Sequence, residues 1–450
     1  MRAGREAAGR DETARKLVHL GSGGLAFLLR FLTPWEAAGC AAGALAFNLF
    51  ALPRVGGARL FRPEERRAPW RSGIVLYPLS VLLLIVLFRD RVEVAAAGWG
   101  IMAAGDAAAG AAGRRFGRLP LPWNRSKTVL GSLAFAASAA LAAWALLTWM
   151  GRGPAAAALL ALPTALFAAF VESLPWRLDD NLTVPLLSAL FLRGLLEIDP
   201  ARLAASRSDL LARFLAGIVL NAALALLSRR LRLVDGSGAV AGMVVGTLTL
   251  AFGGPAAFAV LMSFFVLGSA ATRAGLRRKE RQGVAQEKRG ARSARHALAN
   301  CGVAVYLALL VAGTATPGMF ALAFVCAYAT AAFDTVSSEV GQAYGGRPIL
   351  ITTLRPVPPG TNGAISWMGT GAGALAALVV GGLAAATGLL PPDLLGVVVI
   401  AAFIGSTADS LLGATLEAKG LMDNDAVNFS NTLAGALAGL GLAELMAMAV

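Results

Sequence analysis

The stretch GDAAAGAAGRRFGRLPLPWNRSKTVLGS, residues 105–132, decides the fold because it joins an acid inside an apolar helix to a basic loop broken by glycine and proline. Asp106 stands eight residues before Arg114. At 1.5 Å per residue, its carboxylate lies roughly 12 Å below the loop. An acid at that depth is costly unless it faces protein, water or a cation. The pattern predicts a membrane-crossing helix that holds a functional charge near its boundary.

The loop after this helix mixes cations, hydroxyl groups and small residues, which suits an oxyanion such as phosphate. We expect Asp106 to carry a divalent cation, Mg²⁺, and Lys127 to act with it in catalysis. The alternative for Asp106 is an ion pair that only holds helices together. The alternative for Lys127 is a solvated lysine at the membrane interface. The other phosphate-binding residues expected here are Arg114, Arg115, Ser126, Thr128, Gly131 and Ser132.

The second half contains a comparable construction. Asp334 lies in AAFDTVSSEVGQAYGG, and the broken loop ILITTLRPVPPGTNGAISWMGT follows it. We expect Asp334 and Arg355 to be catalytic, and the glycines of the loop to let backbone N–H groups approach an anion. The alternative is a turn that only connects two helices. The expected phosphate-binding residues are Thr352, Thr353, Gly360, Thr361, Asn362, Gly363 and Ser366.

Further acids and amides near the helix ends complete two candidate metal sites. Ser338 lies four residues after Asp334 on the same helical face, so it is better placed than Glu339 to share a ligand. The pair Asp179 and Asp180 has an ordinary loop turn as its alternative. The candidate metal ligands are Asp106, Glu172, Asp180 and Asn181 in the first half, and Asp334, Ser338, Glu339, Asp409, Asn424 and Asn428 in the second.

The composition excludes several classes of protein. Hydrophobic residues make up 57% of the chain and charged residues 15%, and the mean hydropathy is +0.67, so a soluble globular domain is excluded. The net charge of +14 comes from Lys and Arg in short loops between apolar segments, which topology explains without nucleic acid. Two histidines exclude a His-rich metal site in each half, and GxxxxGK[ST] does not occur.

Apolar periodicity predicts an all-α polytopic membrane protein of about fifteen transmembrane helices. Most of the 40 Lys and Arg residues fall inside if the N-terminus is cytoplasmic. The two tandem modules are residues 1–232 and 233–450. Because the first half contains an even number of spans, eight, the two modules have the same orientation in the membrane, with both sites at the cytoplasmic face. The spans are 17–32, 35–53, 73–88, 92–112, 128–150, 154–172, 182–196, 209–228, 233–252, 255–272, 297–316, 318–344, 364–389, 394–416 and 427–450.

The first half resembles the phytol kinase and dolichol kinase family of membrane lipid alcohol kinases, which use CTP. The resemblance rests on RKLVH at 15–19, GDAAAGAAGRRFG at 105–117, SKTVLGS at 126–132 and ESLPWRLDDNLTVP at 172–185. The second half resembles a family long labelled as a domain of unknown function, whose plant members are phytyl-phosphate kinases. Its signatures are residues 272–304, DTVSSEVG at 334–341, residues 351–370, DSLLGATLE at 409–417 and NDAVNFSNTLAG at 424–435.

The two resemblances imply a bifunctional kinase in which a prenyl alcohol becomes a monophosphate in the first module and a diphosphate in the second. CTP as donor is implied by the resemblance alone. The expected partners are the prenol, its phosphate, a nucleotide and the lipid bilayer, and the expected location is a bacterial inner membrane. The alternative from another class is a transporter or flippase of a phosphorylated lipid, which needs the same basic loops but no nucleotide.

Overall fold

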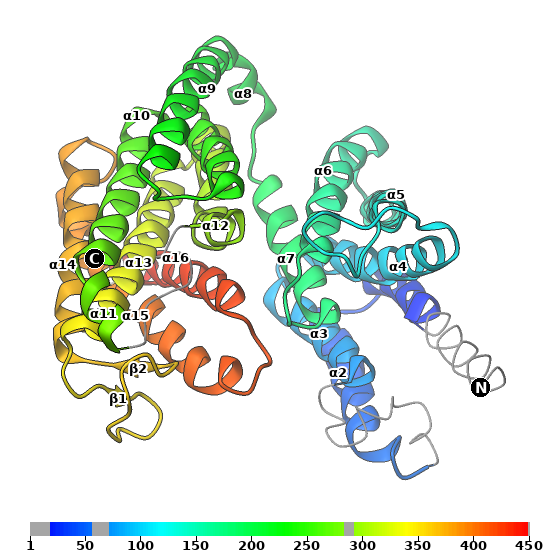
Figure 1. Ribbon diagram of the computed structural model, residues 1–450. Coiled ribbons are helices and arrows are strands. Elements are labelled where there is room, and N and C mark those ends of the chain that lie inside the picture. Colours follow the sequence, from blue (N-terminus) through cyan, green and yellow to red (C-terminus); the bar gives the residue numbers. More distant parts are fainter. Residues whose placement is uncertain (1–18, 56–71, 283–291, 449–450) are drawn as a thin grey trace. The chain divides into compact units, whose positions relative to one another are not determined.

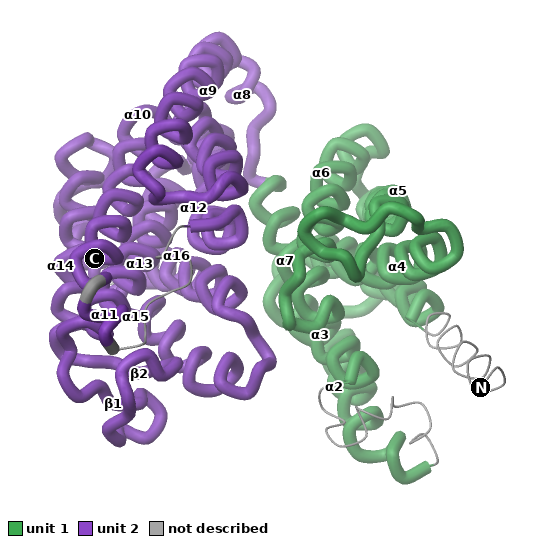
Figure 2. Tube along the Cα trace, in the orientation of Figure 1, with its two compact units in different colours: residues 1–196 green, residues 197–450 purple. Residues whose placement is uncertain are grey.

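The computed structural model describes residues 19–55, 72–282 and 292–448 (Figure 1). The chain forms two compact units, residues 1–196 and 197–450 (Figure 2). The boundary therefore lies before the predicted one at 232/233. The reason is that the helix at 207–230 packs along the helix that follows it rather than in the first unit.

The first unit is a bundle of helices in which α4 packs against both α5 and α7. Thr33 starts α2 with a capping box, since its backbone N–H donates to Glu36 Oε2 at 2.8 Å and its hydroxyl oxygen accepts from the Glu36 backbone N–H at 3.3 Å. The elements are η1 (Gly24–Arg30), α2 (Pro34–Ala46), the π-helical turn η2 (Phe47–Ala51), α3 (Gly73–Leu87), α4 (Val92–Phe116), α5 (Val129–Trp149), α6 (Pro154–Ser173) and α7 (Asp180–Leu195).

The second unit is built around α13, which packs against α10, α12, α14, α15 and α16. Its helices are α8 (Pro200–Ala205), α9 (Arg207–Arg230), α10 (Gly236–Ala274), α11 (Leu276–Gln282), α12 (Ala294–Gly313), α13 (Pro317–Tyr344), α14 (Trp367–Ala386), η7 (Pro392–Leu394), α15 (Leu395–Leu412), the π-helical turn η8 (Gly413–Glu417) and α16 (Asn424–Met448). Two short strands, β1 (Ile349–Leu350) and β2 (Ala364–Ile365), pair antiparallel between α13 and α14.

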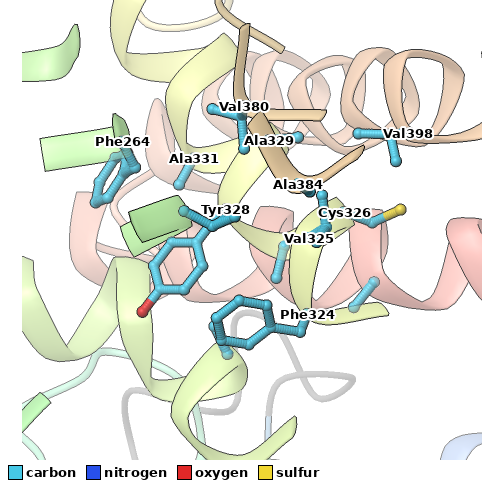
Figure 3. Packing of buried hydrophobic residues seen from close by; sticks show 14 of the residues in the cluster. Phe264, Phe324, Val325, Cys326, Tyr328, Ala329, Ala331, Val380, Ala384 and Val398 are labelled. Carbon is cyan, nitrogen blue, oxygen red and sulfur yellow. The ribbon is translucent and has the colours of Figure 1, made fainter. Parts of the chain in front are cut away.

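The core of the second unit lies along α13 because this helix is apolar on almost every side. Tyr328 of α13 is fully buried between Phe264 of α10 and Phe324 one turn earlier (Figure 3). The rings of Phe324 and Tyr328 meet edge to face with centroids 5.0 Å apart, a favoured aromatic geometry. A helix buried on all sides fixes the position of any acid that it carries.

The helices confirm the all-α membrane class, and eight of those among the described residues are long and apolar enough to cross a membrane. They are α5, α6, α9, α10, α12, α13, α14 and the stretch from Pro392 to Glu417. The two spans predicted at 233–252 and 255–272 correspond to the two parts of α10, which are separated by the non-helical backbone of Gly254 (φ 77°) before Pro255. Fifteen crossings and a cytoplasmic N-terminus stay predictions.

Candidate functional site

A close helix–loop–helix contact joins α4 to α5 in the first unit. Thr128 caps α5, since its Oγ1 accepts a hydrogen bond from the Gly131 backbone N–H at 3.1 Å. The same hydroxyl lies against the end of α4: a Cβ placed on Gly113 would meet it at 3.1 Å, and one on Gly117 at 2.5 Å. The contact therefore requires glycine at position 117 and leaves little room for a side chain at position 113. We name Gly113, Gly117, Thr128 and Gly131 the first hairpin cradle.

The second unit repeats this contact between α13 and α14. Ser366 caps α14 by accepting from the Gly369 backbone N–H at 3.1 Å. A Cβ on Gly341 would lie 3.0 Å from the Ser366 hydroxyl oxygen, and one on Gly345 would lie 2.5 Å from it. The second hairpin cradle is thus Gly341, Gly345, Ser366 and Gly369, with each member in the role of its counterpart.

Equal spacing places the two intramembrane acids at equivalent points of these hairpins. Asp106 precedes Gly113 by seven residues, and Asp334 precedes Gly341 by the same number. At the residue before each acid the packing is reciprocal: a Cβ on Gly105 would lie 2.6 Å from the ring of Phe135, and one on Gly373 would lie 2.6 Å from the ring of Phe333. In the first hairpin α4 supplies the glycine and α5 the ring, and in the second hairpin α13 supplies the ring and α14 the glycine. Each acid therefore follows a residue that packs closely against the second helix of its hairpin.

Asp106 lines a cavity of about 580 Å³ in the first unit. Lys127 lies in it between two carboxylates, donating to Glu172 Oε1 and, at 2.8 Å, to Asp180 Oδ2. Burial lowers the pKa of Lys127, but the adjacent Asp180 and Glu172 outweigh it, and the net pKa is raised. The amine is therefore a stable cation. Other residues that line this cavity are His19, Asn124, Ser126, Trp176, Asp179 and Asn181.

The loop that carries Lys127 is fastened to the end of α6. Trp123 Nε1 donates to the Ser173 hydroxyl at 3.1 Å, and Asn124 Nδ2 donates to the Ser173 carbonyl at 3.1 Å. This anchoring pair was not among the predicted residues. Five predicted phosphate ligands do not line the cavity, because they lie at the end of α4 or at the start of α5: Arg114, Arg115, Thr128, Gly131 and Ser132.

The second unit encloses a larger cavity, of about 850 Å³. At its polar end, the carboxyl group of Asp334 on α13 lies against that of Asp409 on α15. Asn431 of α16 donates from Nδ2 to Asp409 Oδ1 at 2.7 Å. Glu417, at the end of the π-helical turn η8, lines the same cavity. The helices α13, α15 and α16 and the turn η8 thus bring together three acids and an amide, which come from positions between 334 and 431 of the sequence.

The loop between α13 and α14 lines this cavity at Pro348 and Ile351 and then continuously from Pro359 to Ser366. Gly360 and Gly363 have positive φ (85° and 75°), as expected for glycines that turn the backbone. A Cβ on Gly363 would lie 2.4 Å from the Ser410 carbonyl oxygen, so the loop docks directly on α15. Besides Asp334, Asp409 and Glu339, the predicted residues that line the cavity are Ser338, Gly360, Thr361, Asn362, Gly363, Ser366, Asn424 and Asn428.

Three residues predicted for this site are placed elsewhere. Thr352, Thr353 and Arg355 are exposed and outside the cavity lining, because the pairing of β1 with β2 folds this part of the loop away from it. Glu339 does line the cavity, but its carboxylate is engaged by Lys279 and by the Thr272 hydroxyl at 3.1 Å. It neutralises a buried lysine, which makes it a poor metal ligand.

The donor set of the second cavity nevertheless fits Mg²⁺. The described residues hold no group of three or more His, Cys, Asp or Glu suited to a metal. Mg²⁺, however, is usually held by one or two carboxylates and keeps its remaining positions for water and phosphate. Asp334 and Asp409 supply two carboxylates, and the buried Asn431 Oδ1 beside them has no hydrogen-bond partner. Asn431 was not predicted, since an amide inside an apolar helix is usually a helix-to-helix bond.

Comparison with known proteins places residues 219–436 in the family described as Integral membrane protein DUF92. The chain is 36% identical over 211 residues to the chloroplast protein VTE6 of Arabidopsis thaliana, covering 45% of this chain and 63% of that one. It is 36% identical to an uncharacterized membrane protein of Synechocystis sp., covering 52% of this chain and 93% of the relative.

A third relative is named probable phytol kinase 3, chloroplastic, from Glycine max. The identity is 32% over 212 residues, 42% of this chain and 66% of the relative. This chain therefore spans somewhat less than two thirds of the plant proteins VTE6 and phytol kinase 3. No solved structure matches it.

Proposed function

The chain belongs to the DUF92 integral membrane protein family, and from this premise we propose that it is a lipid kinase that phosphorylates a prenyl alcohol twice. The first unit converts the alcohol to its monophosphate, and the second converts the monophosphate to the diphosphate. The donor is a nucleoside triphosphate, CTP by resemblance, and the metal is Mg²⁺. Both sites lie at the cytoplasmic face of a bacterial inner membrane.

The observation that carries this proposal is the pair of equivalent hairpins, each presenting an acid to a cavity. Two similar sites in one chain fit two successive transfers of the same group. The names of the relatives support the substrate class, since one of them is a probable phytol kinase. A transporter of phosphorylated lipid has no need of two such sites.

In each transfer the bond between the terminal phosphorus and its bridging oxygen breaks, and the nucleoside diphosphate leaves. A new bond forms to the alcohol oxygen in the first step and to a phosphate oxygen in the second. The proton of the alcohol passes to a carboxylate of the first cavity. Lys127 holds Glu172 and Asp180 in place for this step and offers a cation to the phosphoryl oxygens.

In the second unit, Asp334 and Asp409 would hold Mg²⁺, with the amide oxygen of Asn431 as a further ligand. The ion, when bound, neutralises negative charge on the phosphates. The backbone from Gly360 to Gly363 turns twice through positive φ at the cavity wall, and we propose that these glycines let it approach an anion closely. The buried helix α13 keeps Asp334 fixed while the phosphoryl group moves.

The test is a direct assay of the purified full chain with a prenol, Mg²⁺ and labelled CTP or ATP. We expect lipid monophosphate to appear first and diphosphate later. Monophosphate supplied as substrate should give diphosphate without a lag. If no lipid phosphate forms with any nucleotide and several prenol lengths, while the protein moves a phosphorylated lipid across vesicles, the chain is a transporter.

A further inference from the structure

Arg292 occupies a fixed place at the entrance of α12, and it was not among the predicted site residues. Its backbone N–H donates to the Leu233 carbonyl, and its carbonyl accepts from the Asp235 N–H, both at 3.1 Å. A Cβ on Gly238 would lie 2.1 Å from that carbonyl oxygen, so the segment fits tightly against the start of α10. The backbone of Arg292 is therefore held on both sides, and its side chain has a defined origin.

The guanidinium group is held as well. It lies over the rings of Phe264 and Phe265, at 5.1 Å and 5.7 Å from their centroids, a cation–π arrangement. Gly268 provides the space: a Cβ there would lie 2.2 Å from Nη2 of Arg292 and 3.2 Å from the methyl group of Thr335. The charge thus sits beside the residue that follows Asp334.

Nothing in the described part of the chain neutralises this charge, since none of its ion pairs includes Arg292. Arg295, three residues later, differs in this respect because it pairs with Asp423 and Asp425 at 2.9 and 2.8 Å. Burial lowers the pKa of Arg292 from its ordinary value. An arginine stays protonated even so, and the desolvated charge would be stabilised by an anion.

The position of Arg292 in the cavity indicates which anion it meets. The rings of Phe264 and Phe265 lie next to the guanidinium, and Leu261 of the same helix also lines the cavity. Thr335, which follows Asp334, is near the guanidinium as well, and the acids Asp334 and Asp409 of the proposed metal site line the same cavity. A cation that lies between apolar and polar parts of a cavity is well placed to bind the charged head group of an amphiphile, whose chain then occupies the apolar part.

We propose that Arg292 binds a phosphate group of the ligand in the second cavity. Its planar fork can take two phosphate oxygens at once. The junction favours the phosphate of the lipid acceptor, while a phosphate of the nucleotide has the same chemistry. The identification of the ligand as a lipid phosphate or a nucleotide rests on the proposed function. The anion site itself rests on the geometry of Arg292.

The experiment measures binding by the full chain in detergent or nanodiscs, separately for geranylgeranyl monophosphate and for CTP with Mg²⁺. We expect Arg292→Gln to weaken at least one of them about 10- to 100-fold, the loss typical of a hydrogen bond to a charged group. Weakening of the monophosphate alone assigns Arg292 to the acceptor, and weakening of CTP alone assigns it to the donor. Arg278→Gln is the matched control, since Arg278 is exposed and outside the cavity lining.

Two further variants guard against a folding defect. Arg292→Lys keeps the charge without the fork and should recover part of the lost affinity. Gly268→Ala keeps Arg292 but displaces its guanidinium, so it should weaken the same ligand. Its control is Gly382→Ala in α14, where a Cβ meets nothing within 4 Å.

Binding and turnover separate the two proposals. If wild-type protein binds a phosphate ligand through Arg292 but makes no product, the kinase proposal fails and the anion site stands. If wild-type protein makes diphosphate while folded Arg292→Gln binds both ligands with unchanged affinity, the kinase proposal stands and the role of Arg292 is wrong.

Discussion

Lys127 is the cation that the first cavity places between two acids, Glu172 and Asp180. Its side chain is 27% exposed, so the group can still reach a phosphate that enters the cavity. A charge placed in advance at the point where phosphoryl charge develops contributes more to catalysis than the same charge in water. The side chain is therefore suited both to positioning the carboxylates and to contacting the donor.

We predict that Lys127→Met lowers the alcohol kinase rate by about 100-fold, the loss typical of one electrostatic contact to the transition state. The reason is that the two carboxylates then repel both each other and the phosphate. Lys127→Arg should retain more activity. The rate of diphosphate formation from supplied monophosphate serves as the internal control, and an unchanged alcohol kinase rate in Lys127→Met would leave this lysine a structural role only.

A substitution of Asp334 tests the proposed site in the second cavity. We predict that Asp334→Asn stops diphosphate formation and that monophosphate accumulates from the alcohol, because one of the two carboxylates proposed for Mg²⁺ is lost. Chelation of Mg²⁺ should instead stop both steps in wild-type protein, because the donor and both proposed sites use the ion. Both lipid products are measured over time.

Asp393→Asn, at an exposed turn before α15, is the matched control and should behave as wild type. Asp106→Asn should show the reverse pattern, with the alcohol inert and the monophosphate still converted. Loss of both activities in either variant, with the protein folded, would mean that the two acids serve one shared site.

At the scale of elements, the hairpin cradles show what spacing alone can predict. The acid, the broken loop and the hydroxyl before the next helix were predicted in both halves from residue order. Prediction stopped at contacts between distant segments: Asn431 meets Asp409 across two helices, and Arg355 is turned away by a strand pair of only two residues. Neither contact leaves a periodic signal, because each depends on how whole helices pack.

The second cradle gives a prediction that concerns packing rather than charge. A Cβ at Gly345 would lie 2.4 Å from the Gly341 carbonyl oxygen and 2.5 Å from the Ser366 hydroxyl, so Gly345→Ala must displace the cap of α14. We expect a loss of about 1–3 kcal/mol in stability, the usual cost of overpacking. Diphosphate formation should fall with it, while alcohol phosphorylation should not.

The control for Gly345→Ala is Gly371→Ala in α14, where a Cβ meets nothing within 4 Å. Gly117→Ala should produce the mirror result in the first unit. Thermal unfolding and the two product rates are measured for all three proteins. If Gly345→Ala unfolds at the wild-type temperature, the cradle does not constrain the two helices.

At the scale of the whole molecule, the two units each contain a complete candidate site: every lining residue of the smaller cavity belongs to the first unit and every lining residue of the larger one to the second. The residue order indicated two related halves, yet it placed their boundary at 232/233 rather than at 196/197. The prediction assigned α9 to the first half because this helix comes directly after the other helices of that half in the sequence. Its partner is α10, and helix pairing of this kind is decided by side-chain fit, as where Gly217 lies against Thr247.

Separate sites in one chain lead to a prediction about mixtures of variants. Asp106→Asn protein should be unable to start from the alcohol, and Asp334→Asn protein should stop at the monophosphate. When the two are reconstituted in the same vesicles, monophosphate made by one can diffuse in the bilayer to the other, so diphosphate should reappear from the alcohol. It should appear more slowly than in wild type, because the intermediate must leave one molecule and find another.

The measurement is diphosphate yield against the ratio of the two variants, with the same variants in separate vesicles as the control. Persistent failure of the mixture, while each variant keeps its remaining single step, would show that the monophosphate never leaves the chain in which it is made. Failure together with loss of the single steps would instead contradict the division of labour between the units.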